Sequence, residues 1–372
     1  MPTAIPCLLM RGGTSKGAFF NAVHLPQDVA TRDRVLLAAM GSPDRRQIDG
    51  IGGGHPLTSK IGIVSKSAQA GVHLEFLFAQ VQPDRDTVDT RPNCGNMLAA
   101  AVPFALATGM LQAQGHTATF RVLARNTGML ADITLPLSAG QLIDGGDACI
   151  DGVPGTAAAI EICFLETAGS VCKRLLPTGN SRERINVTGE GFEPFSLEVT
   201  CIDNGMPLVI FKAADLGASG YESVAELDAN TELRRRVEAL RLQAAQVMGL
   251  GNVSAKNYPK MTMVAAPRQG GAICTRSFIP HVCHESIGVL AAVTVGTAIH
   301  LPGSICEGIA QRQAGAAVET IAIEHPSGLM SVTLSRSASQ PDEPPQVALL
   351  RTARVLMRGE VMVPSAVWEG AA

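Results

Sequence analysis

The sequence predicts an α+β protein made of two similar halves, and three observations lead to this fold class. Short segments with the composition of β-strands outnumber the segments with helical periodicity. Two of the helical segments are apolar on every side, which places them inside a domain. An internal repeat links the two halves of the chain. A length of 372 residues also allows two domains of ordinary size.

Ten segments are predicted strands because they are short, rich in β-branched or large apolar residues, and generally bounded by Gly, Pro, Asn or Asp. They are Ala18–Asn21, Ile61–Val64, His73–Leu77, Thr119–Leu123, Leu130–Leu135, Ala158–Phe164, Leu197–Cys201, Leu208–Phe211, Met261–Val264 and Ala272–Phe278. Four segments are predicted helices. Thr31–Met40 and Thr231–Met248 each have one polar face and stop at a glycine, whereas Asn96–Ala107 and Ser286–His300 are the apolar pair.

The repeat consists of four features in the same order. Gly17–Leu25 is similar to Leu208–Leu216, the helix stopped by Gly41 matches the helix stopped by Gly249, Lys60–Val64 matches Lys260–Val264, and Cys94 with Leu98–Val102 matches Cys283 with Leu290–Val293. Each half should therefore contain a strand, a helix, a strand and a buried helix. The predicted domains are 1–182 and 183–344, with a C-terminal segment, 345–372, that could cross back to the first half. The polar stretch Thr178–Arg184 marks the first boundary.

Composition excludes several classes of protein. Aromatic residues make up only 4% of the chain and the net charge is −3, so neither nucleic acid nor an anionic membrane is an expected partner. The nine cysteines are odd in number and form no CxxC pair, which favours free thiols in a reducing compartment. No signal peptide and no apolar run of about 20 residues is evident. We therefore expect a cytoplasmic protein.

The motif Arg91-Pro-Asn-Cys-Gly-Asn-Met-Leu98 precedes the first apolar helix. Asn93 or Asn96 can cap this helix, and Gly95 lets a ligand approach the backbone closely. Cys94 then lies where free N–H groups and the positive end of the helix dipole meet. This setting favours a thiolate that acts as base or nucleophile, while the N–H groups can hold a carboxylate. The alternative is a buried structural cysteine.

Two glycine-rich segments supply further candidates. Met10-Arg-Gly-Gly-Thr-Ser-Lys-Gly17 lacks the GxxxxGK[ST] pattern and no helix follows it, so a carboxylate suits Arg11, Thr14 and Ser15 better than a nucleotide does. The alternative is a plain turn with solvated cations. Lys60 follows the second glycine-rich segment and could enter a cleft as a neutral base. Its alternative role is a surface lysine that reaches solvent.

The second apolar helix begins near His281-Val-Cys-His-Glu-Ser-Ile-Gly288, which places Cys283, His284 and Glu285 at another helix start. If the two halves face each other, two helix N-termini point into one cleft, an arrangement that suits a dianion or trianion. Alternatively, Glu285 and Ser286 merely cap the helix. No convincing metal-ligand set, GxSxG elbow or dinucleotide fingerprint occurs, so no metal, nucleotide or flavin cofactor is expected.

Five motifs carry a resemblance to a known family: Met10-Arg-Gly-Gly-Thr-Ser-Lys-Gly17, Ile48-Asp-Gly-Ile-Gly-Gly53, Thr58-Ser-Lys60, Asn93-Cys-Gly-Asn96 and Glu324-His-Pro-Ser-Gly328. Across nearly the whole chain, the sequence resembles the 2-methylaconitate cis–trans isomerase family, which has the diaminopimelate epimerase-like fold. The segments Gly41–Gly50 and Pro280–His284 favour, within that family, the enzymes that act on 4-oxalomesaconate in gallate and protocatechuate breakdown.

The resemblance implies two pseudo-symmetric domains, each a curled, mostly antiparallel sheet around a central buried helix, with the active site between them. It also implies catalysis of an allylic isomerisation by a cysteine and a lysine, which correspond to Cys94 and Lys60. The epimerases of this fold have a second cysteine at the second buried helix. Cys283 lies near that place as a possible second acid or base, but the epimerases' Cys-Gly-Thr pattern is absent around it.

The expected reaction is a 1,3-proton shift on an unsaturated tricarboxylate, with Lys60 and Cys94 as an acid–base pair whose individual roles are not assigned. The expected lining consists of polar and flexible groups near the two helix starts: Arg11, Thr14, Ser15, Ser59, Gly95, Asn96, Met206, Arg276, Ser277, His281 and His284. Two alternatives are an isomerase of 2-methylaconitate or a related acid, and a family member that binds a carboxylate without turnover. The large apolar content, 46%, makes a homodimer reasonable.

Overall fold

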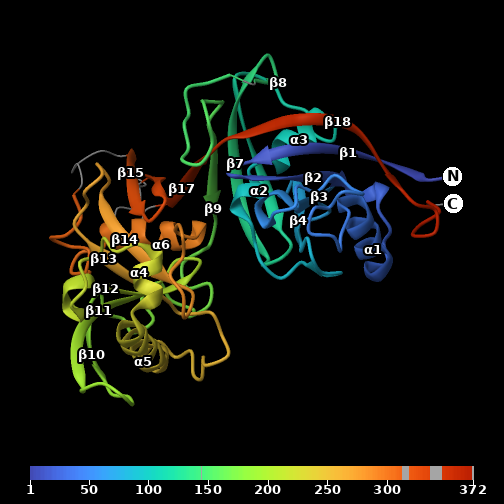
Figure 1. Ribbon diagram of the computed structural model, residues 1–372. Coiled ribbons are helices and arrows are strands. Elements are labelled where there is room, and N and C mark those ends of the chain that lie inside the picture. Colours follow the sequence, from blue (N-terminus) through green and yellow to red (C-terminus); the bar gives the residue numbers. More distant parts are fainter. Residues whose placement is uncertain (144, 312–317, 336–345, 371–372) are drawn as a thin grey trace. The chain divides into compact units, whose positions relative to one another are not determined.

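The computed structural model describes residues 1–143, 145–311, 318–335 and 346–370, which form two compact units (Figure 1). The first unit comprises Met1–Leu165 and Leu350–Ala372, and the second comprises Glu166–Leu349. The first boundary thus falls earlier than the expected 182. The segment that begins at Glu166 packs with the second unit, because the Asp203 carboxylate of that unit accepts the N–H groups of Val171 and Cys172 at 2.7 Å each. The expected boundary at 344 lies outside the described residues.

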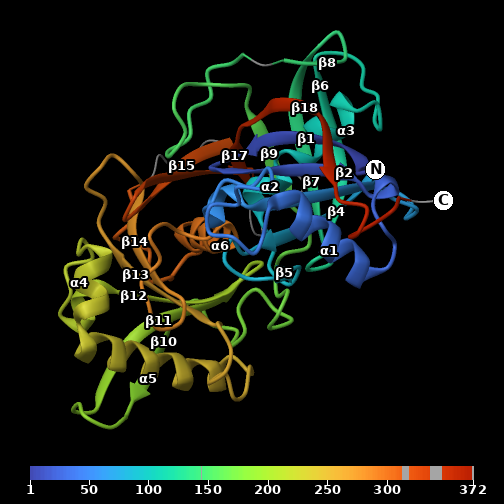
Figure 2. The ribbon, with the colours of Figure 1, turned by 45° about the vertical axis from the view of Figure 1, so that its right-hand side comes forward.

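The first unit contains one curled sheet. Its strands follow the order β18 (Ala353–Val363), β1 (Thr3–Gly12), β2 (Ser15–Asn21), β3 (Lys60–Lys66), β4 (Leu74–Val81), β6 (Thr117–Ala124), β7 (Met129–Ser138) and β9 (Ile160–Phe164). Two short strands, β5 (Val88–Asp89) and β8 (Gln141–Leu142), pair with β4 and β7. Only β2–β3 and β4–β6 are parallel. The C-terminal strand β18, red in Figures 1 and 2, runs beside the N-terminal strand β1.

The second unit repeats this connectivity with its own strands. The order is β10 (Glu183–Val187), β11 (Phe195–Asp203), β12 (Pro207–Lys212), β13 (Lys260–Ala265), β14 (Ile273–Phe278), β15 (Val318–His325), β16 (Gly328–Ser335) and β17 (Gln346–Arg351). The parallel pairs, β12–β13 and β14–β15, fall at the same places in the order as those of the first unit. All ten predicted strands are confirmed, although most extend beyond the predicted bounds.

The internal repeat is confirmed down to the register of the parallel strands. In the first unit Gly17 of β2 lies opposite Lys60 of β3, and in the second Leu208 of β12 lies opposite Lys260 of β13. These are the residues that the sequence repeat aligned. The two lysines therefore occupy equivalent positions, each at the first residue of a strand, and any difference between them comes from their neighbours.

The outer helices connect equivalent strands in the two units. In the first unit, η1 (Ala22–His24) and α1 (Val29–Met40) lie between β2 and β3; α1 is capped by Asp28 and ends at Gly41, whose φ is 78°. In the second unit, η3 (Ala213–Leu216), α4 (Val224–Ala229) and α5 (Thr231–Val247) lie between β12 and β13. A further short turn, η2 (Pro56–Thr58), leads into β3. Both amphipathic helices are confirmed, and α1 buries the apolar face that the sequence predicts.

A central helix fills each curled sheet, but neither has the predicted bounds. The first is divided into α2 (Gly95–Leu98) and α3 (Ala101–Ala107), because Pro103 has no N–H to donate to the carbonyl of Ala99. The second, α6 (Val289–Ile299), begins at Gly288 as its N-cap, so the motif around Cys283 lies in the preceding loop. Every residue of α6 from Ala291 onwards is buried. In the described residues, no helix is long and apolar enough to cross a membrane.

Candidate active site

Cys94 lies directly before α2, with its thiol half-buried and its carbonyl oxygen accepting the N–H of Leu98 at 2.9 Å. No side chain caps this helix start, and the side chain of Asn93 instead accepts the N–H of Cys94 at 2.8 Å. Among the described residues, the N–H groups of Gly95 and Asn96 have no acceptor. The helix start is therefore open to an anionic group, as the motif predicts.

Asn96 fixes α2 to the glycine-rich turn between β1 and β2. Its Nδ2 donates to Oγ1 of Thr14 at 2.9 Å. The contact requires glycines: a Cβ on Gly12 would lie 2.3 Å from the Asn96 carbonyl oxygen, and Gly13 has a φ of +51° with its Cβ position 2.2 Å from Oδ1 of Asn96. The glycine-rich turn and the motif around Cys94, 82 residues apart at this contact, thus meet in one place, and the Asn96 side chain connects them.

Arg351 approaches the same place from the far end of the chain. Its Nε donates to Oδ1 of Asn96 at 3.0 Å, and only 6% of the residue is exposed. Burial lowers the pKa of Arg351 to about 10, and the neighbouring Cys94 thiol acts in the opposite direction. Sequence reasoning missed this residue because nothing around Arg351 in the sequence indicates that its side chain reaches Asn96.

Arg11 and Ser15, both predicted to bind substrate, have contrasting surroundings. Nη1 of Arg11 donates to the carbonyl oxygens of Gly13 and Thr352 at 2.9 and 3.0 Å, which holds the turn in shape. Burial, followed by the charge of Arg354, lowers the pKa of Arg11. Ser15 is only 1% exposed, and its Oγ has no hydrogen-bond partner among the described residues. A buried hydroxyl without a partner is uncommon and points to a group that a ligand completes.

Lys60 is buried, which excludes a surface lysine that reaches solvent: 8% of the residue is exposed. Its Nζ lies 2.6 Å from Oε1 of Gln80 and 5.0 Å from the ring centroid of Phe78. Because α2 packs against β1, β2 and β3, the lysine strand, the glycine-rich turn and Cys94 are neighbours within the first unit. The structure therefore brings the two predicted catalytic residues to adjoining elements of one unit.

Ser59, a further predicted binding residue, uses its hydroxyl for hydrogen bonds to the loop that precedes it. Its Oγ is fully buried and lies 2.7 Å from Oε1 of Gln47 and 2.8 Å from the carbonyl oxygen of His55. Gln47 in turn accepts the N–H of Gly54 at 2.9 Å. These contacts favour a structural role for the Ser59 hydroxyl, which shapes the approach to Lys60.

The predicted residues on the strands of the second unit are also well anchored. Nε of Arg276 on β14 donates to the carbonyl oxygen of Glu222 at 2.7 Å, and its Nη1 donates to that of Thr275 at 2.9 Å. The Oγ of Ser277 lies 3.3 Å from Oγ1 of Thr262. Met206 is half-buried in the turn between β11 and β12. Whether these groups share a cleft with Cys94 stays a prediction.

The three titratable residues after β14 have different environments. The side chain of His281 is 58% exposed, with its Nδ1 3.6 Å from the Glu238 carboxylate. Nδ1 of His284 accepts the N–H of Ser286 at 2.8 Å, and burial followed by the charge of Lys260 lowers the pKa of His284. Cys283 packs in the core of the second unit, where burial raises its pKa to about 11. This environment favours a structural thiol rather than a second acid or base.

The motif Glu324-His-Pro-Ser-Gly328 has a structural explanation. Glu324 is 2% exposed, and its Oε1 accepts the N–H groups of Arg268, Gln269 and Gly271 at 2.9, 2.5 and 3.0 Å. Burial opposes the charge, but these donors outweigh it and hold the pKa of Glu324 below its usual value. Glu324 therefore shapes the turn between β13 and β14.

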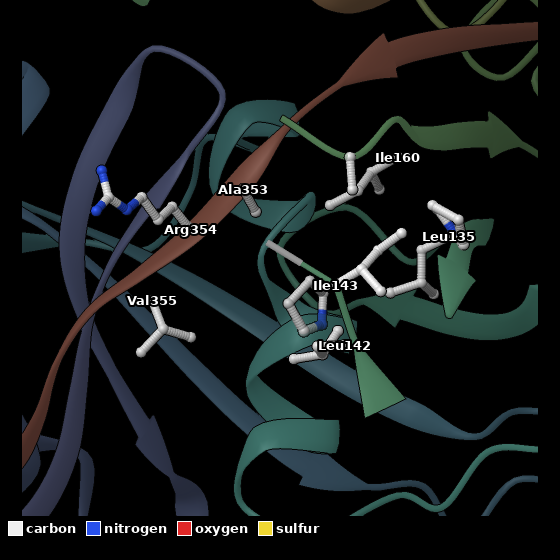
Figure 3. A pocket seen from close by; sticks show the side chains of 10 residues that line it. Leu135, Leu142, Ile143, Ile160, Ala353, Arg354 and Val355 are labelled. Carbon is white, nitrogen blue, oxygen red and sulfur yellow. The ribbon is translucent and has the colours of Figure 1, made fainter. Parts of the chain in front are cut away.

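Figure 3 shows a separate hollow in the first unit, of about 30 Å³, between α3, β7, β8, β9 and β18. Its lining includes Leu135, Leu142 and Ile160, and the Arg354 guanidinium points away from these apolar side chains. None of the predicted site residues lines this hollow. Its size and apolar lining do not suit a tricarboxylate, so the candidate site is the cluster around Cys94.

The chain matches the family model described as PrpF protein over residues 3–364. It is 49% identical over 368 residues to 4-oxalomesaconate tautomerase of Pseudomonas putida, covering 99% of this chain and 98% of that protein. It is also 49% identical over 358 residues to (4E)-oxalomesaconate Delta-isomerase of Novosphingobium sp., covering 96% and 97% of the two chains. The solved structure of a methylitaconate-delta-isomerase superimposes with a TM-score of 0.87 at 30% identity, covering 100% and 98%.

Fold and comparisons together define the class of protein: an isomerase with the diaminopimelate epimerase-like fold. Within this class, the chain belongs to the PrpF family. The fold class and the family resemblance that the sequence predicts are thereby confirmed.

Proposed function

We propose that the protein catalyses a 1,3-allylic proton shift on an unsaturated tricarboxylate, with Lys60 and Cys94 as its acid–base pair. The observation that carries this proposal is the placement of a buried amine on β3 and a half-buried thiol before α2, on adjoining elements of one unit. Both groups can give or take a proton, and the elements that hold them pack against each other.

The proton shift balances without a further reactant. One group of the pair removes a proton from the carbon at one end of the allyl unit, and the electron pair of that C–H bond spreads into a dienolate. The open N–H groups of Gly95 and Asn96 stabilise the charge where it develops. The other group returns a proton to the far carbon, so the double bond moves and the composition of the substrate is unchanged.

The proposed substrate is 4-oxalomesaconate, which would place the enzyme in gallate and protocatechuate degradation. The two relatives at 49% identity are named for oxalomesaconate and together match almost the whole chain. The site is rich in groups that bind carboxylates: Arg11, the unpartnered hydroxyl of Ser15, and the open start of α2. Several carboxylates on one small molecule suit this concentration of donors.

An ultraviolet assay tests the proposal, because the conjugated double bond moves during the reaction. With 4-oxalomesaconate, the purified protein should change the spectrum catalytically, and with 2-methylaconitate it should act much more slowly. Faster turnover of 2-methylaconitate would replace the proposed substrate by the alternative one. If neither spectrum changes, incubation of both acids in D₂O with NMR detection decides whether the protein only binds: a binder leaves every carbon-bound proton in place.

Three properties complete the proposal: activity without an added cofactor, a cytoplasmic location and a homodimeric state. Five cysteines support a cytoplasmic location, because they are buried free thiols, which suit a reducing compartment: Cys7, Cys201, Cys274, Cys283 and Cys306.

The other two properties can be tested directly. Extensive dialysis against a chelator should leave turnover unchanged. Light scattering of the purified protein should give about twice the mass of one chain, 38.8 kDa; a mass equal to one chain would contradict the dimer.

A further inference from the structure

We infer that Gln80 is a positioning residue for Lys60: its side-chain oxygen holds the lysine amine in place without supplying a negative charge. The inference deepens the proposed function, on which it rests for the role of Lys60. Gln80 belongs to none of the motifs that the sequence highlights. Its importance comes from its place in the sheet, directly opposite Lys60 in the antiparallel pair β3–β4.

The geometry of the contact is well defined. Nζ of Lys60 lies 2.6 Å from Oε1 of Gln80, a short hydrogen bond. Phe78, two residues earlier on the same face of β4, places its ring 5.0 Å from the same nitrogen. The amine is thus held between an amide oxygen and an aromatic ring, at a fixed place at the start of β3.

The surroundings of Gln80 determine which end of its amide faces the lysine. Its Nε2 lies within hydrogen-bond distance of three carbonyl oxygens, those of Pro56, Ser59 and Val81, at 3.1, 3.2 and 3.2 Å, among which its two N–H groups are shared. An amide turned the other way would direct its oxygen at three carbonyl oxygens and its NH₂ at the amine of Lys60, which is itself a donor. Oε1 therefore has to face Lys60, and the backbone around η2 supports the lysine through Gln80.

The neutrality of this partner matters for an acid–base residue. Lys60 forms no ion pair with any carboxylate among the described residues. On the elements packed around it, the titratable side chains are those of Lys16 on β2, Cys94 before α2, His55 before η2 and Asp89 on β5; Asp89 lies opposite Gln80 and forms its ion pair with Arg91. A carboxylate in the place of Gln80 would add an ion pair that stabilises the ammonium form, whereas an amide holds the amine in position without adding a charge.

The second unit provides an internal comparison. Lys260 occupies the position equivalent to Lys60, but β14 ends at Phe278, which faces Met261, and the residue that follows the strand is Ile279 instead of a glutamine. An isoleucine offers no acceptor. Only the lysine that the family resemblance marks as catalytic has an amide opposite it, which argues against a general structural need for glutamine at this place in the fold.

Gln80→Met and Gln80→Glu test the inference, with Gln69→Met and Gln69→Glu as matched controls in the exposed turn before β4. Gln80→Met keeps the length of the side chain but removes the acceptor. It should lower kcat about tenfold to a hundredfold while KM changes little, as expected for a displaced catalytic group. An unchanged kcat in a folded Gln80→Met protein would overturn the inference.

Gln80→Glu gives the readout that a purely structural role would not move. The limb of the kcat–pH profile that Lys60 controls should shift to higher pH by about one unit or more, whichever role the lysine plays. The Gln69 variants should keep the wild-type profile. An unshifted limb in Gln80→Glu would contradict the inference.

A chemical measurement separates this inference from the proposed function. Acetylation of Lys60 by an activated ester, followed by peptide mass spectrometry, requires no turnover; Gln80→Glu should slow it at least about threefold at pH 8, because the ammonium form does not react. If the wild type isomerises no acid while acetylation slows as expected, the proposed function fails and the lysine–amide contact stands. If the wild type is active and acetylation in Gln80→Glu is unchanged, the inference fails and the function stands.

Discussion

Arg351 donates a hydrogen bond from Nε to Oδ1 of Asn96, 3.0 Å away and 255 residues earlier in the chain. The contact places a buried guanidinium beside the start of α2, where Cys94 lies. A buried cation at this place can bind a negatively charged group of a ligand. Arg351 thus contributes a charge to a site whose other members lie in the first hundred residues.

The Arg351→Met variant tests this contribution. Loss of the guanidinium should lower kcat/KM about tenfold to a hundredfold, because the negatively charged substrate loses a cation that binds it. Because an apolar side chain of similar length replaces a buried cation, the protein should still fold. Steady-state kinetics measure the change. Arg85→Met, in an exposed loop, is the matched control; a wild-type kcat/KM in Arg351→Met would exclude the proposed contribution.

Replacement of either member of the proposed acid–base pair should abolish most of the activity. Cys94→Ala and Lys60→Met should each reduce kcat at least about a hundredfold, the usual range for an acid–base group being 10²–10⁴. Circular dichroism should show unchanged secondary structure. Exposed Cys149 and Lys66 provide the controls Cys149→Ala and Lys66→Met, which should retain full turnover. Near-normal turnover in either of the first two variants would remove that residue from the mechanism.

Replacement of Ser15 should affect the stability of the fold and the binding of substrate in opposite directions. Its Oγ is buried without a partner, so Ser15→Ala removes an unsatisfied polar atom and should raise the free energy of unfolding by up to about 1 kcal/mol. The same change should raise KM, because the substrate loses a hydrogen bond. Urea unfolding and steady-state kinetics measure the two effects, with Ser138→Ala at an exposed strand end as the control. A less stable protein with unchanged KM would show that the hydroxyl serves the fold instead.

Glu324 should contribute to the free energy of unfolding in a way that depends on pH. Its pKa is lowered in the folded protein, so the contribution is complete above the ordinary carboxyl value of 4.5 and is lost as the pH falls through the folded-state pKa. Glu324→Gln should lower the free energy of unfolding by about 1–3 kcal/mol at pH 7, and this difference should shrink below about pH 4.5. Urea titrations at pH 7 and in the acid range, beside the exposed control Glu193→Gln, check it. An equal loss at both pH values would contradict a role for the charge.

Local sequence patterns were sufficient for much of the fold. Strand composition, glycine stops and apolar faces act over a few residues, so the ten strands and both amphipathic helices could be predicted. The repeat extended this to the register, because it aligned Lys60 with Lys260. β1 was missed because Pro6 interrupts its pattern; Pro6 lies outside the part of β1 that pairs with β2, although it lies opposite Glu360 of β18. The strands β10 and β15 to β18 were also missed.

The candidate site could be predicted only where a motif is contiguous. The turn at Gly12 and Gly13 and the start of α2 are local features, and the structure joins them through Asn96. Gln80 and Arg351 were missed because their contacts arise from strand pairing and from the return of the chain, which no local pattern encodes. Conversely, Ser59 and Cys283 have residue types suited to chemistry, but burial and internal hydrogen bonds favour structural roles for them.

The position of deuterium in the product tests the central claim most directly. When the wild-type enzyme isomerises the unsaturated tricarboxylate in D₂O, a pair of separate groups should remove protium at one end of the allyl unit and deliver deuterium at the other. NMR of the product after a single turnover should therefore show deuterium at the far carbon. Complete transfer of the original protium to that carbon would mean that one group does both steps, and would contradict the pairing of Lys60 with Cys94.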